Sequence, residues 1–84
     1  MNNKVLIKIY VPTLDETYEL YIPTNETIKK ILSLVTKLVS DFSDSDFEAN
    51  DDKMLIDSET CKPYTEDTLV RDTNIRNSKL LILI

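Results

Sequence analysis

The spacing of apolar residues changes along this chain, and the changes constrain its fold more than any single motif does. Residues 4–11 and 17–22 alternate apolar and polar side chains, which is typical of half-buried β-strands. Residues 28–40 repeat apolar side chains every three to four positions, as the buried face of an α-helix does. Residues 79–84 are nearly all apolar and have the length of a strand. The pattern predicts one helix packed against a small sheet.

Turn and capping residues mark the limits of the first elements. A turn at residues 13–16 predicts an antiparallel hairpin between the two alternating runs. Pro23 ends the second run, and the hydroxyl of Thr24 or Thr27 can accept a hydrogen bond from the amides of a first helical turn. We expect the helix to end near Ser40.

The second half of the chain predicts a third strand at residues 53–57, with Met54 and Ile56 on one face. Residues 61–64 are expected to form either a fourth strand or an extended segment. Pro63 restricts this segment to an edge of the sheet, because proline cannot donate a ladder hydrogen bond.

The last turn, at residues 76–78, leads into the final strand. Asn77 is expected to adopt a positive φ, since asparagine tolerates that region better than most residues other than glycine. The element order is ββαββ, so we predict an α+β fold with one helix across a mixed sheet of four to five strands. Residues 1–84 are expected to form a single domain.

The charge of the chain disfavours two classes of partner. Its net charge is −5, and its lysine and arginine residues are scattered rather than clustered. Nucleic-acid binding needs a basic surface, and an acidic surface is repelled by anionic lipids. We therefore expect a protein partner, with no nucleic acid and no membrane insertion.

Histidine and glycine are absent from all 84 residues. Without histidine there is no imidazole base or imidazole metal ligand, and without glycine there is no phosphate-binding loop. These absences predict a protein that is not an enzyme and that binds no cofactor.

Cys61 is the only cysteine, which excludes an internal disulfide and suits a reducing compartment. Only Lys62 is placed to activate its thiol, and a half-buried structural cysteine beside an edge strand is the simpler interpretation. The longest apolar stretch, residues 80–84, is too short to span a membrane, and the first residues lack a signal-peptide pattern. We expect a cytoplasmic protein.

Residues 41–52 contain six acidic residues and no basic one. Side chains with oxygen atoms stand at alternate positions, like the ligands of a calcium-binding loop: Asp44, Asp46, Glu48, Asn50 and Asp52. The glycine and the glutamate that such a loop needs are replaced by Ala49 and Leu55. We interpret the segment as a solvated acidic loop and predict no metal site.

Residues 68–83 resemble the signature Leu-x-Asp-x-x-Ile-x-x-x-(small)-x-Leu-x-Leu of the ubiquitin superfamily. The helix start at Thr27 and Ile28 also matches that superfamily. The resemblance covers essentially the whole chain and implies a ubiquitin-like β-grasp fold. We assign the defining positions of the signature to Leu69, Asp72, Ile75, Leu80 and Ile82.

Within that superfamily the chain is most similar to the small bacterial EsaB/YukD group, accessory proteins of type VII (WXG100/ESX-type) secretion systems in Gram-positive bacteria. Residues 23–31 resemble the group's Pro-x-x-x-x-Ile-Lys-x-(Ile/Leu) pattern, although Asn77 stands where the group commonly has glycine. The resemblance implies a cytoplasmic accessory or regulatory component of such a system.

Conjugated members of the superfamily carry a mobile tail that ends in two glycines. Here residues 79–84 read as a strand with no such tail, and we expect a non-conjugated protein. Two alternatives remain open at this point. One is a sulfur carrier or modifier that is activated at its carboxyl terminus, and the other is a structural homodimer.

The face of the sheet opposite the helix is the predicted docking surface. We expect the helix-facing residues to be Val5, Ile7, Ile9, Leu80, Ile82 and Ile84. The opposite face then carries a contiguous apolar patch, which on a small protein commonly marks an interaction site. Ubiquitin-like domains usually dock through the same face, so the resemblance implies it too. The predicted protein-binding residues are Leu6, Lys8, Tyr10, Tyr21, Leu55, Leu81 and Leu83.

Overall fold

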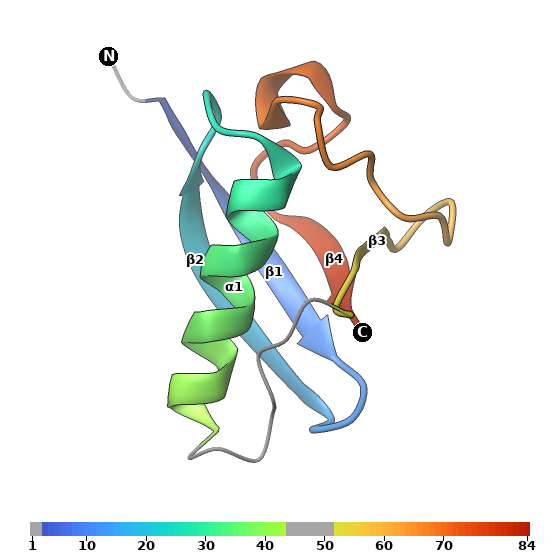
Figure 1. The fold of residues 1–84 in the computed structure, drawn as a ribbon. Helices are drawn as coiled ribbons and strands as arrows, with labels where there is room; N and C mark the ends of the chain where they lie inside the picture. Colours follow the sequence, from blue (N-terminus) through green and yellow to red (C-terminus); the bar gives the residue numbers. More distant parts are fainter. Residues whose placement is uncertain (1–2, 44–51) are drawn as a thin grey trace.

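A helix lies across one face of a four-stranded sheet in the computed structural model, which describes residues 3–43 and 52–84 (Figure 1). The strand order is β2-β1-β4-β3. Strand β1 pairs antiparallel with β2 and parallel with β4, and β3 pairs antiparallel with β4. The predicted mixed sheet with one helix is confirmed. The elements are β1 Lys4–Val11, β2 Glu16–Pro23, α1 Ile28–Phe42, β3 Leu55–Asp57, the 3-10 helix η1 Val70–Asp72 and β4 Lys79–Leu83.

Helix α1 begins and ends close to the predicted limits. Thr27 is its N-cap, and the Thr27 hydroxyl oxygen accepts a hydrogen bond from the Lys30 amide at 3.3 Å. The helix continues past the predicted end at Ser40 and reaches Phe42. Within residues 3–43 and 52–84, no helix is both long and apolar enough to cross a membrane.

The first amides of α1 are satisfied by the segment that precedes η1. The Ile28 amide donates to the Thr68 carbonyl at 2.9 Å, and the Lys29 amide donates to the Glu66 carbonyl at 3.0 Å. This contact ties residues far apart in the sequence, since helix termini need partners for amides that have none within the helix. The segment before β4 is thereby docked on the amino-terminal end of α1.

The core lies between α1 and the sheet. Its apolar side chains come from every strand, from α1, from η1 and from the turn that follows η1, because each element has one face that must leave water. The buried cluster consists of Ile7, Ile9, Val11, Ile22, Ile28, Ile31, Val35, Val39, Leu55, Val70, Ile75, Leu81 and Leu83.

The predicted faces of β4 are wrong. Leu81 and Leu83 are 0% exposed and lie in the core, whereas Leu80 is 39% exposed on the opposite face. The cause is the register with β1, in which Ile9 pairs with Leu81. Neighbours across a sheet point to the same side, so Leu81 follows Ile9 into the core.

The structure also corrects the positions assigned to the ubiquitin-superfamily signature. Counted from Asp72 within the pattern itself, Val70 rather than Leu69 takes the first apolar position. With the same spacing, Leu81 and Leu83 take the last two leucine positions of the signature, in place of Leu80 and Ile82. Val70, Leu81 and Leu83 are all buried, so the apolar positions of the signature agree with the structure at this spacing, whereas its small-residue position falls on Lys79.

Strand β3 is shorter than predicted, and its faces are also reversed. Leu55 is 2% exposed and belongs to the core, while Ile56 pairs with Ile82 on the opposite side. Met54 lies outside β3 but exchanges two backbone hydrogen bonds with Ile84, at 2.7 and 3.1 Å. The ladder between β3 and β4 therefore continues for one further pair.

The predicted edge segment at residues 61–64 contains no regular strand. Pro63 forms an isolated bridge with Ile56. The Asp57 amide donates to the Lys62 carbonyl at 2.9 Å, and the Tyr64 amide donates to the Leu55 carbonyl at 3.1 Å. These contacts cover the outer edge of β3.

The turn before β4 differs from the prediction in one residue. Ser78 has the positive φ, at 70°, and Asn77 does not. Instead, the Asn77 side-chain oxygen accepts a hydrogen bond from the Leu6 amide at 2.9 Å, and the Ser78 amide donates to the Leu6 carbonyl at 2.7 Å. The asparagine therefore supplies an acceptor to β1 in place of a strand carbonyl.

Alanine substitutions in β4 test which side chains lie in the core. Leu83→Ala is expected to lower the free energy of unfolding by about 2–5 kcal/mol, because it leaves a cavity at a fully buried site. Leu80→Ala is expected to cost about 1 kcal/mol or less, since that side chain is partly in water already. Urea unfolding monitored by circular dichroism measures both. A loss that is equal in the two variants, or larger for Leu80→Ala, would contradict the assignment.

Candidate docking surface

The sheet face opposite α1 is not covered by any of the described helices or strands (Figure 1). The strand registers decide which side chains point to it, because paired residues share a side. We call this surface the open face. Its members within the paired strands are Lys4, Leu6, Lys8 and Tyr10 from β1, Thr17, Glu19, Tyr21 and Pro23 from β2, Ile56 from β3, and Leu80 and Ile82 from β4.

Three of the predicted protein-binding residues do not lie on the open face. Leu55, Leu81 and Leu83 are in the core, for the reasons of register given above. Their places on the open face are taken by their neighbours in the chain. Four predicted residues do lie there, and their role in binding stays a prediction: Leu6, Lys8, Tyr10 and Tyr21.

Apolar side chains dominate the half of the open face formed by β3 and β4. Leu80 and Ile82 lie there beside Ile56, which is itself buried, and the exposed side chains of Met54 and Ile84 continue the row at its end. On the other half, Tyr21 is 63% exposed. An apolar surface of this kind on a small domain commonly marks a site of protein interaction.

Lys8 and Glu19 bring one positive and one negative charge to the open face. They are paired residues in the register of β1 and β2. Among the ion pairs of the described residues, none joins Lys8 to Glu19. Both charges therefore remain available to a partner.

Tyr10 is fixed by the turn of the hairpin. Its hydroxyl donates a hydrogen bond to the Asp15 carboxylate at 2.9 Å. That hydrogen bond, followed by the negative charge of Asp15, raises the pKa of Tyr10 above its ordinary value. Asp15 itself has a positive φ of 51°, so the contact joins the ring to the tightest point of the turn.

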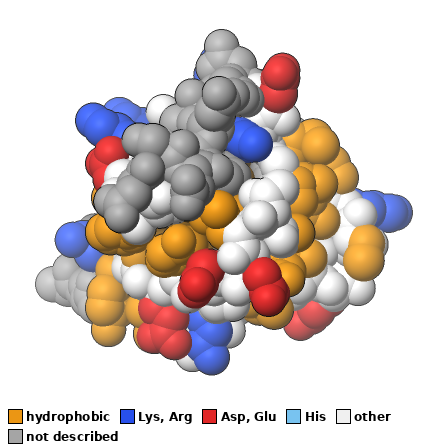
Figure 2. Space-filling model, turned by 90° about the horizontal axis from the view of Figure 1, so that it is seen from below, with side chains coloured by type: hydrophobic (Ala, Val, Ile, Leu, Met, Phe, Trp, Pro, Cys, Tyr) orange, Lys and Arg blue, Asp and Glu red, His pale blue; other side chains and the backbone are white. Residues whose placement is uncertain are grey.

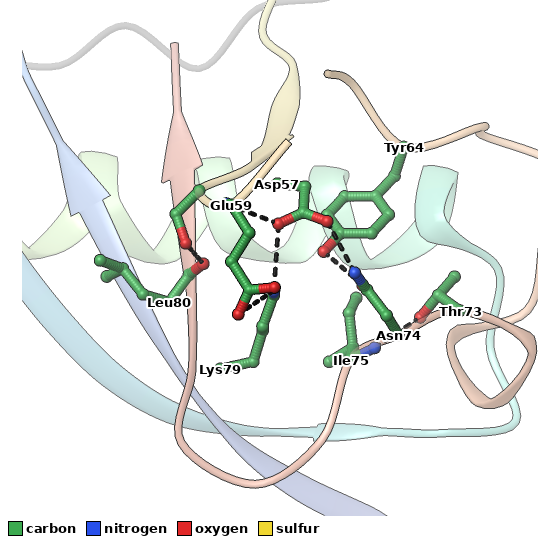
Figure 3. A network of polar contacts seen from close by, with 9 residues as sticks. Asp57, Glu59, Tyr64, Thr73, Asn74, Ile75, Lys79 and Leu80 are labelled. Carbon is green, nitrogen blue, oxygen red and sulfur yellow. Dashed lines mark hydrogen bonds and ion pairs between the residues drawn. The ribbon is translucent and has the colours of Figure 1, made fainter. Parts of the chain in front are cut away.

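A buried carboxylate connects β3 with β4 on the side of the sheet that faces α1 (Figure 3). Asp57 is 4% exposed and receives the Lys79 ammonium at 3.0 Å and the Glu59 amide at 2.9 Å on one oxygen. The Asn74 amide group donates to its other oxygen at 2.7 Å. Each oxygen of the carboxylate therefore has a partner.

Lys79 bridges two carboxylates. It lies 3.0 Å from Asp57 and 3.2 Å from Glu59, and its own side chain is largely buried. Burial disfavours the charged form of Lys79, but the hydrogen bonds and charges of the two acids outweigh that effect and raise its pKa. The ammonium is thus held in its charged form at the start of β4.

The hydrogen bonds to Asp57 shift its pKa in the opposite direction. The bond from Asn74 has the largest effect, followed by the bond from the Glu59 amide, and together with Lys79 they lower the pKa well below its ordinary value despite burial. Tyr64 donates its hydroxyl hydrogen to the Asn74 side-chain oxygen at 2.8 Å. Burial, and then the charge of Asp57, raise the pKa of Tyr64.

This network is a structural connection rather than a reactive site, because its members satisfy one another. The sequence pattern did not predict it: the side-chain partners of Asp57, Asn74 and Lys79, lie 17 or more residues away, and no local motif marks them. Among residues 3–43 and 52–84, no group of three or more acidic or cysteine side chains is placed to hold a metal ion. Four of the five residues of the calcium-like pattern, Asp44, Asp46, Glu48 and Asn50, lie outside the described residues.

Cys61 differs from its predicted state. The side chain is exposed rather than half-buried, and the residue has a positive φ of 60°. Its amide donates to the Asp57 carbonyl at 2.8 Å, so its backbone closes the turn after β3. The position is therefore determined by the turn and not by packing of the thiol.

Solved structures share the arrangement described above, although neither a family model nor a curated protein matches the sequence. The EccD5 ubiquitin-like domain from Mycobacterium xenopi is 11% identical with a TM-score of 0.79, and the match covers 99% of this chain and 94% of that one. The ubiquitin-like domain of the Mycobacterium tuberculosis type VII secretion protein EccD1 is 14% identical with a TM-score of 0.77, covering 100% and 99%. The fold is ubiquitin-like.

A third similar structure contains the ubiquitin-like fold as part of a longer chain. It belongs to an ESX-5 inner membrane complex, with 10% identity, a TM-score of 0.73, and coverage of 99% of this chain but 21% of that one. At such low identity the likeness shows that the folds agree. The predicted ubiquitin-like α+β class is thereby confirmed.

The depressed pKa of Asp57 predicts how stability depends on pH. As pH falls below about 4, the ordinary pKa of aspartate, the unfolded chain binds a proton before the folded chain does, so the stabilisation from this carboxylate is progressively lost. Asp57→Asn is expected to cost about 1–3 kcal/mol at neutral pH and to flatten this acid-dependent loss. Urea unfolding between pH 7 and pH 3 measures how steeply the free energy of unfolding falls with pH in the unsubstituted protein and in Asp57→Asn.

Glu59→Gln is the matched control, since Glu59 also pairs with Lys79 but is exposed to solvent. Its acid dependence should stay close to that of the unsubstituted protein, because exposed ion pairs contribute little. If Asp57→Asn loses stability toward low pH as steeply as the unsubstituted protein, the assignment of the acid response to Asp57 is wrong.

Proposed function

We propose that this chain is a non-conjugated ubiquitin-like module that binds another protein through its open face. The observation that carries the proposal is the apolar surface opposite α1, where Tyr21, Leu80, Met54 and Ile84 are exposed. Burial of such a surface against a partner is the main favourable contribution to association. Lys8 and Glu19 supply charges that orient the partner.

We further assign the module to a type VII secretion system, as a cytoplasmic accessory or regulatory component. Its likeness in fold to the ubiquitin-like domains of EccD5 and EccD1 supports this assignment. So does the resemblance of residues 23–31 to the EsaB/YukD group of Gram-positive bacteria. The likeness to a chain of an ESX-5 inner membrane complex favours a membrane-associated component as the partner.

The proposed role is binding without chemistry. The 84 residues include no glycine, so they contain no diglycine for activation, and no histidine to act as a base. Ile84 is also held by its two backbone hydrogen bonds to Met54. These features favour a binding module over an enzyme, a sulfur carrier or a protein modifier.

Capture of the secretion component tests the open face. Leu80→Glu is expected to weaken binding at least tenfold, about 1.4 kcal/mol, because docking would then bury an unpaired carboxylate. The probes are purified cytoplasmic regions of type VII secretion membrane proteins from the same organism, and biolayer interferometry measures the affinity.

Leu34→Glu is the control for that experiment, because Leu34 is 40% exposed on α1, close to the 39% of Leu80. The affinity of the Leu34→Glu variant for the secretion component should equal that of the unsubstituted protein. Equal weakening by both substitutions, or by neither, would defeat docking through the open face. So would a dimer in sedimentation that Leu80→Glu dissociates, because a second copy would then occupy the surface.

Intact-mass spectrometry tests the absence of conjugation. After incubation with a ubiquitin-like activating enzyme and ATP, the mass of the protein is expected to stay unchanged, because activation requires a diglycine and these 84 residues contain no glycine. A diglycine-terminated ubiquitin-like protein in the same reaction serves as the positive control. An adenylate, thioester or thiocarboxylate product would instead establish the sulfur-carrier or modifier alternative.

A further inference from the structure

Met54 is the only sulfur-containing residue among those assigned to the open face. Its side chain is 44% exposed, and it extends the apolar row that contains Leu80, Ile82 and Ile84. Figure 2 shows hydrophobic side chains at the surface of the molecule among acidic and basic ones. The thioether of methionine can be oxidised to a sulfoxide, which is polar, whereas leucine and isoleucine have no such chemistry. The row is therefore fully apolar only while this sulfur is reduced.

The backbone of Met54 is held in place independently of its side chain. Its amide donates to the Ile84 carbonyl at 2.7 Å, and its carbonyl accepts from the Ile84 amide at 3.1 Å. Two such bonds form a hydrogen-bonded pair of an antiparallel ladder, so the two side chains point to the same side. Leu55, the next residue, points to the other side and is buried. The sulfur is thus held at the open face, and a chemical change at the sulfur leaves both backbone bonds intact.

We infer that Met54 is a modification site, whose reversible oxidation weakens docking at the open face; the inference rests on the proposed function. The oxidant is a peroxide. A lone pair of the sulfur attacks one oxygen of hydrogen peroxide, so that an S–O bond forms, the O–O bond breaks and hydroxide leaves. The hydroxide takes the proton of the new S–OH group and becomes water. The sulfur loses two electrons and the peroxide gains them, which gives the sulfoxide.

The modification is reversible because a sulfoxide can be reduced by thiols. A methionine sulfoxide reductase removes the oxygen as water while two thiols are oxidised to a disulfide. The thioether is then restored, and the row on the open face is apolar again.

A sulfoxide changes what the open face offers to a partner. It carries a strong dipole and an acceptor oxygen, and burial of such a group without a donor costs free energy. The side chains beside it, Ile82 and Ile84, have no hydrogen-bond donor. Docking would therefore bury an unpaired oxygen once Met54 is oxidised. The fold itself should tolerate the change, because the Met54 side chain is exposed in the protein by itself.

Two other sulfur atoms must be separated from Met54 in any test. Cys61 is exposed, but it lies in the turn after β3 and is not among the residues of the open face. Met1 is the second methionine of the sequence and lies outside the described residues. All samples therefore carry Cys61→Ser, and a Met54→Leu variant that keeps Met1 reports any effect of oxidation elsewhere.

Oxidation of the protein before a partner is added tests the inference. The protein is treated with hydrogen peroxide, desalted, and assayed by biolayer interferometry against the same cytoplasmic regions of type VII secretion membrane proteins. The oxidised protein is expected to bind at least about fivefold more weakly, because the sulfoxide must be desolvated. Methionine sulfoxide reductases A and B with dithiothreitol should restore the affinity, since each enzyme reduces one epimer. Peptide mass spectrometry measures the sulfoxide at Met54.

Matched variants show whether the position of the sulfur matters. Peroxide should not change the affinity of Met54→Leu, because leucine is apolar but has no sulfur. Adding Leu34→Met to that variant moves the thioether to α1, at a site whose side chain is 40% exposed. Oxidation there should leave binding unchanged. Met54→Gln places a polar amide at the open face and should weaken binding about fivefold without any oxidant.

The possible failures are distinguishable. If the reduced protein binds none of the secretion-system regions, the proposed function and this inference both fail. If the reduced protein binds and Leu80→Glu weakens that binding, but the sulfoxide of Met54 does not, only this inference is overturned. It is also overturned if peroxide forms no sulfoxide at Met54, if Met54→Leu remains sensitive to peroxide, or if urea unfolding shows that oxidation destabilises the fold.

A bound partner provides a reciprocal measurement. Docking covers Met54 if the inference is correct, so a saturating partner should slow formation of its sulfoxide at least about fivefold. The sulfur of the variant with Leu34→Met should be oxidised at the same rate with and without the partner. Equal rates at Met54 would place its sulfur outside the interface and overturn the inference.

Discussion

The alternation of side chains along β4 is the constraint on which both the core and the candidate surface depend. This strand lies between β1 and β3, so a shift of one residue would exchange its buried and exposed side chains. Two sets of contacts near its start hold the register. Lys79 is paired with Asp57 of β3, and the preceding turn bonds to Leu6 of β1. With that register fixed, Leu81 completes the core and Leu80 reaches the open face.

The same sheet order creates two surfaces of different character. The open face presents side chains, so the docking proposed there would depend on apolar burial and on the positions of its charged residues. The outer edge of β2 presents backbone groups that pair with no other described strand. Only the edge of β3 is covered among the described residues, because residues 62–64 fold back on it. The two edges differ because residues 62–64, in the connection from β3 to β4, return to the outer edge of β3.

Tight turns in this chain form without glycine, and the structure shows what replaces it. Asp15, Cys61 and Ser78 adopt positive φ, which costs each of them local backbone energy. Each turn is supported by a compensating contact: Asp15 bonds to Tyr10, the Cys61 amide to Asp57, and the Ser78 amide to Leu6. Asparagine statistics favoured Asn77 for the left-handed position, but its side chain makes a long-range bond to β1 instead. Local preference could not reveal that partner.

The sequence by itself determined the elements, because hydrophobic periodicity and capping depend on neighbours in the chain. The hairpin, the helix with a threonine cap, the last strand and the fold class all follow from it, and the structure selects Thr27 as the cap. Four of the seven predicted surface residues were also placed correctly, since the register of a short hairpin is set locally. Only the tertiary structure decided the faces of β3 and β4 and the partners of Asp57. In nearly uninterrupted apolar strands both faces look alike in sequence, and the choice between them is made by pairing with distant strands.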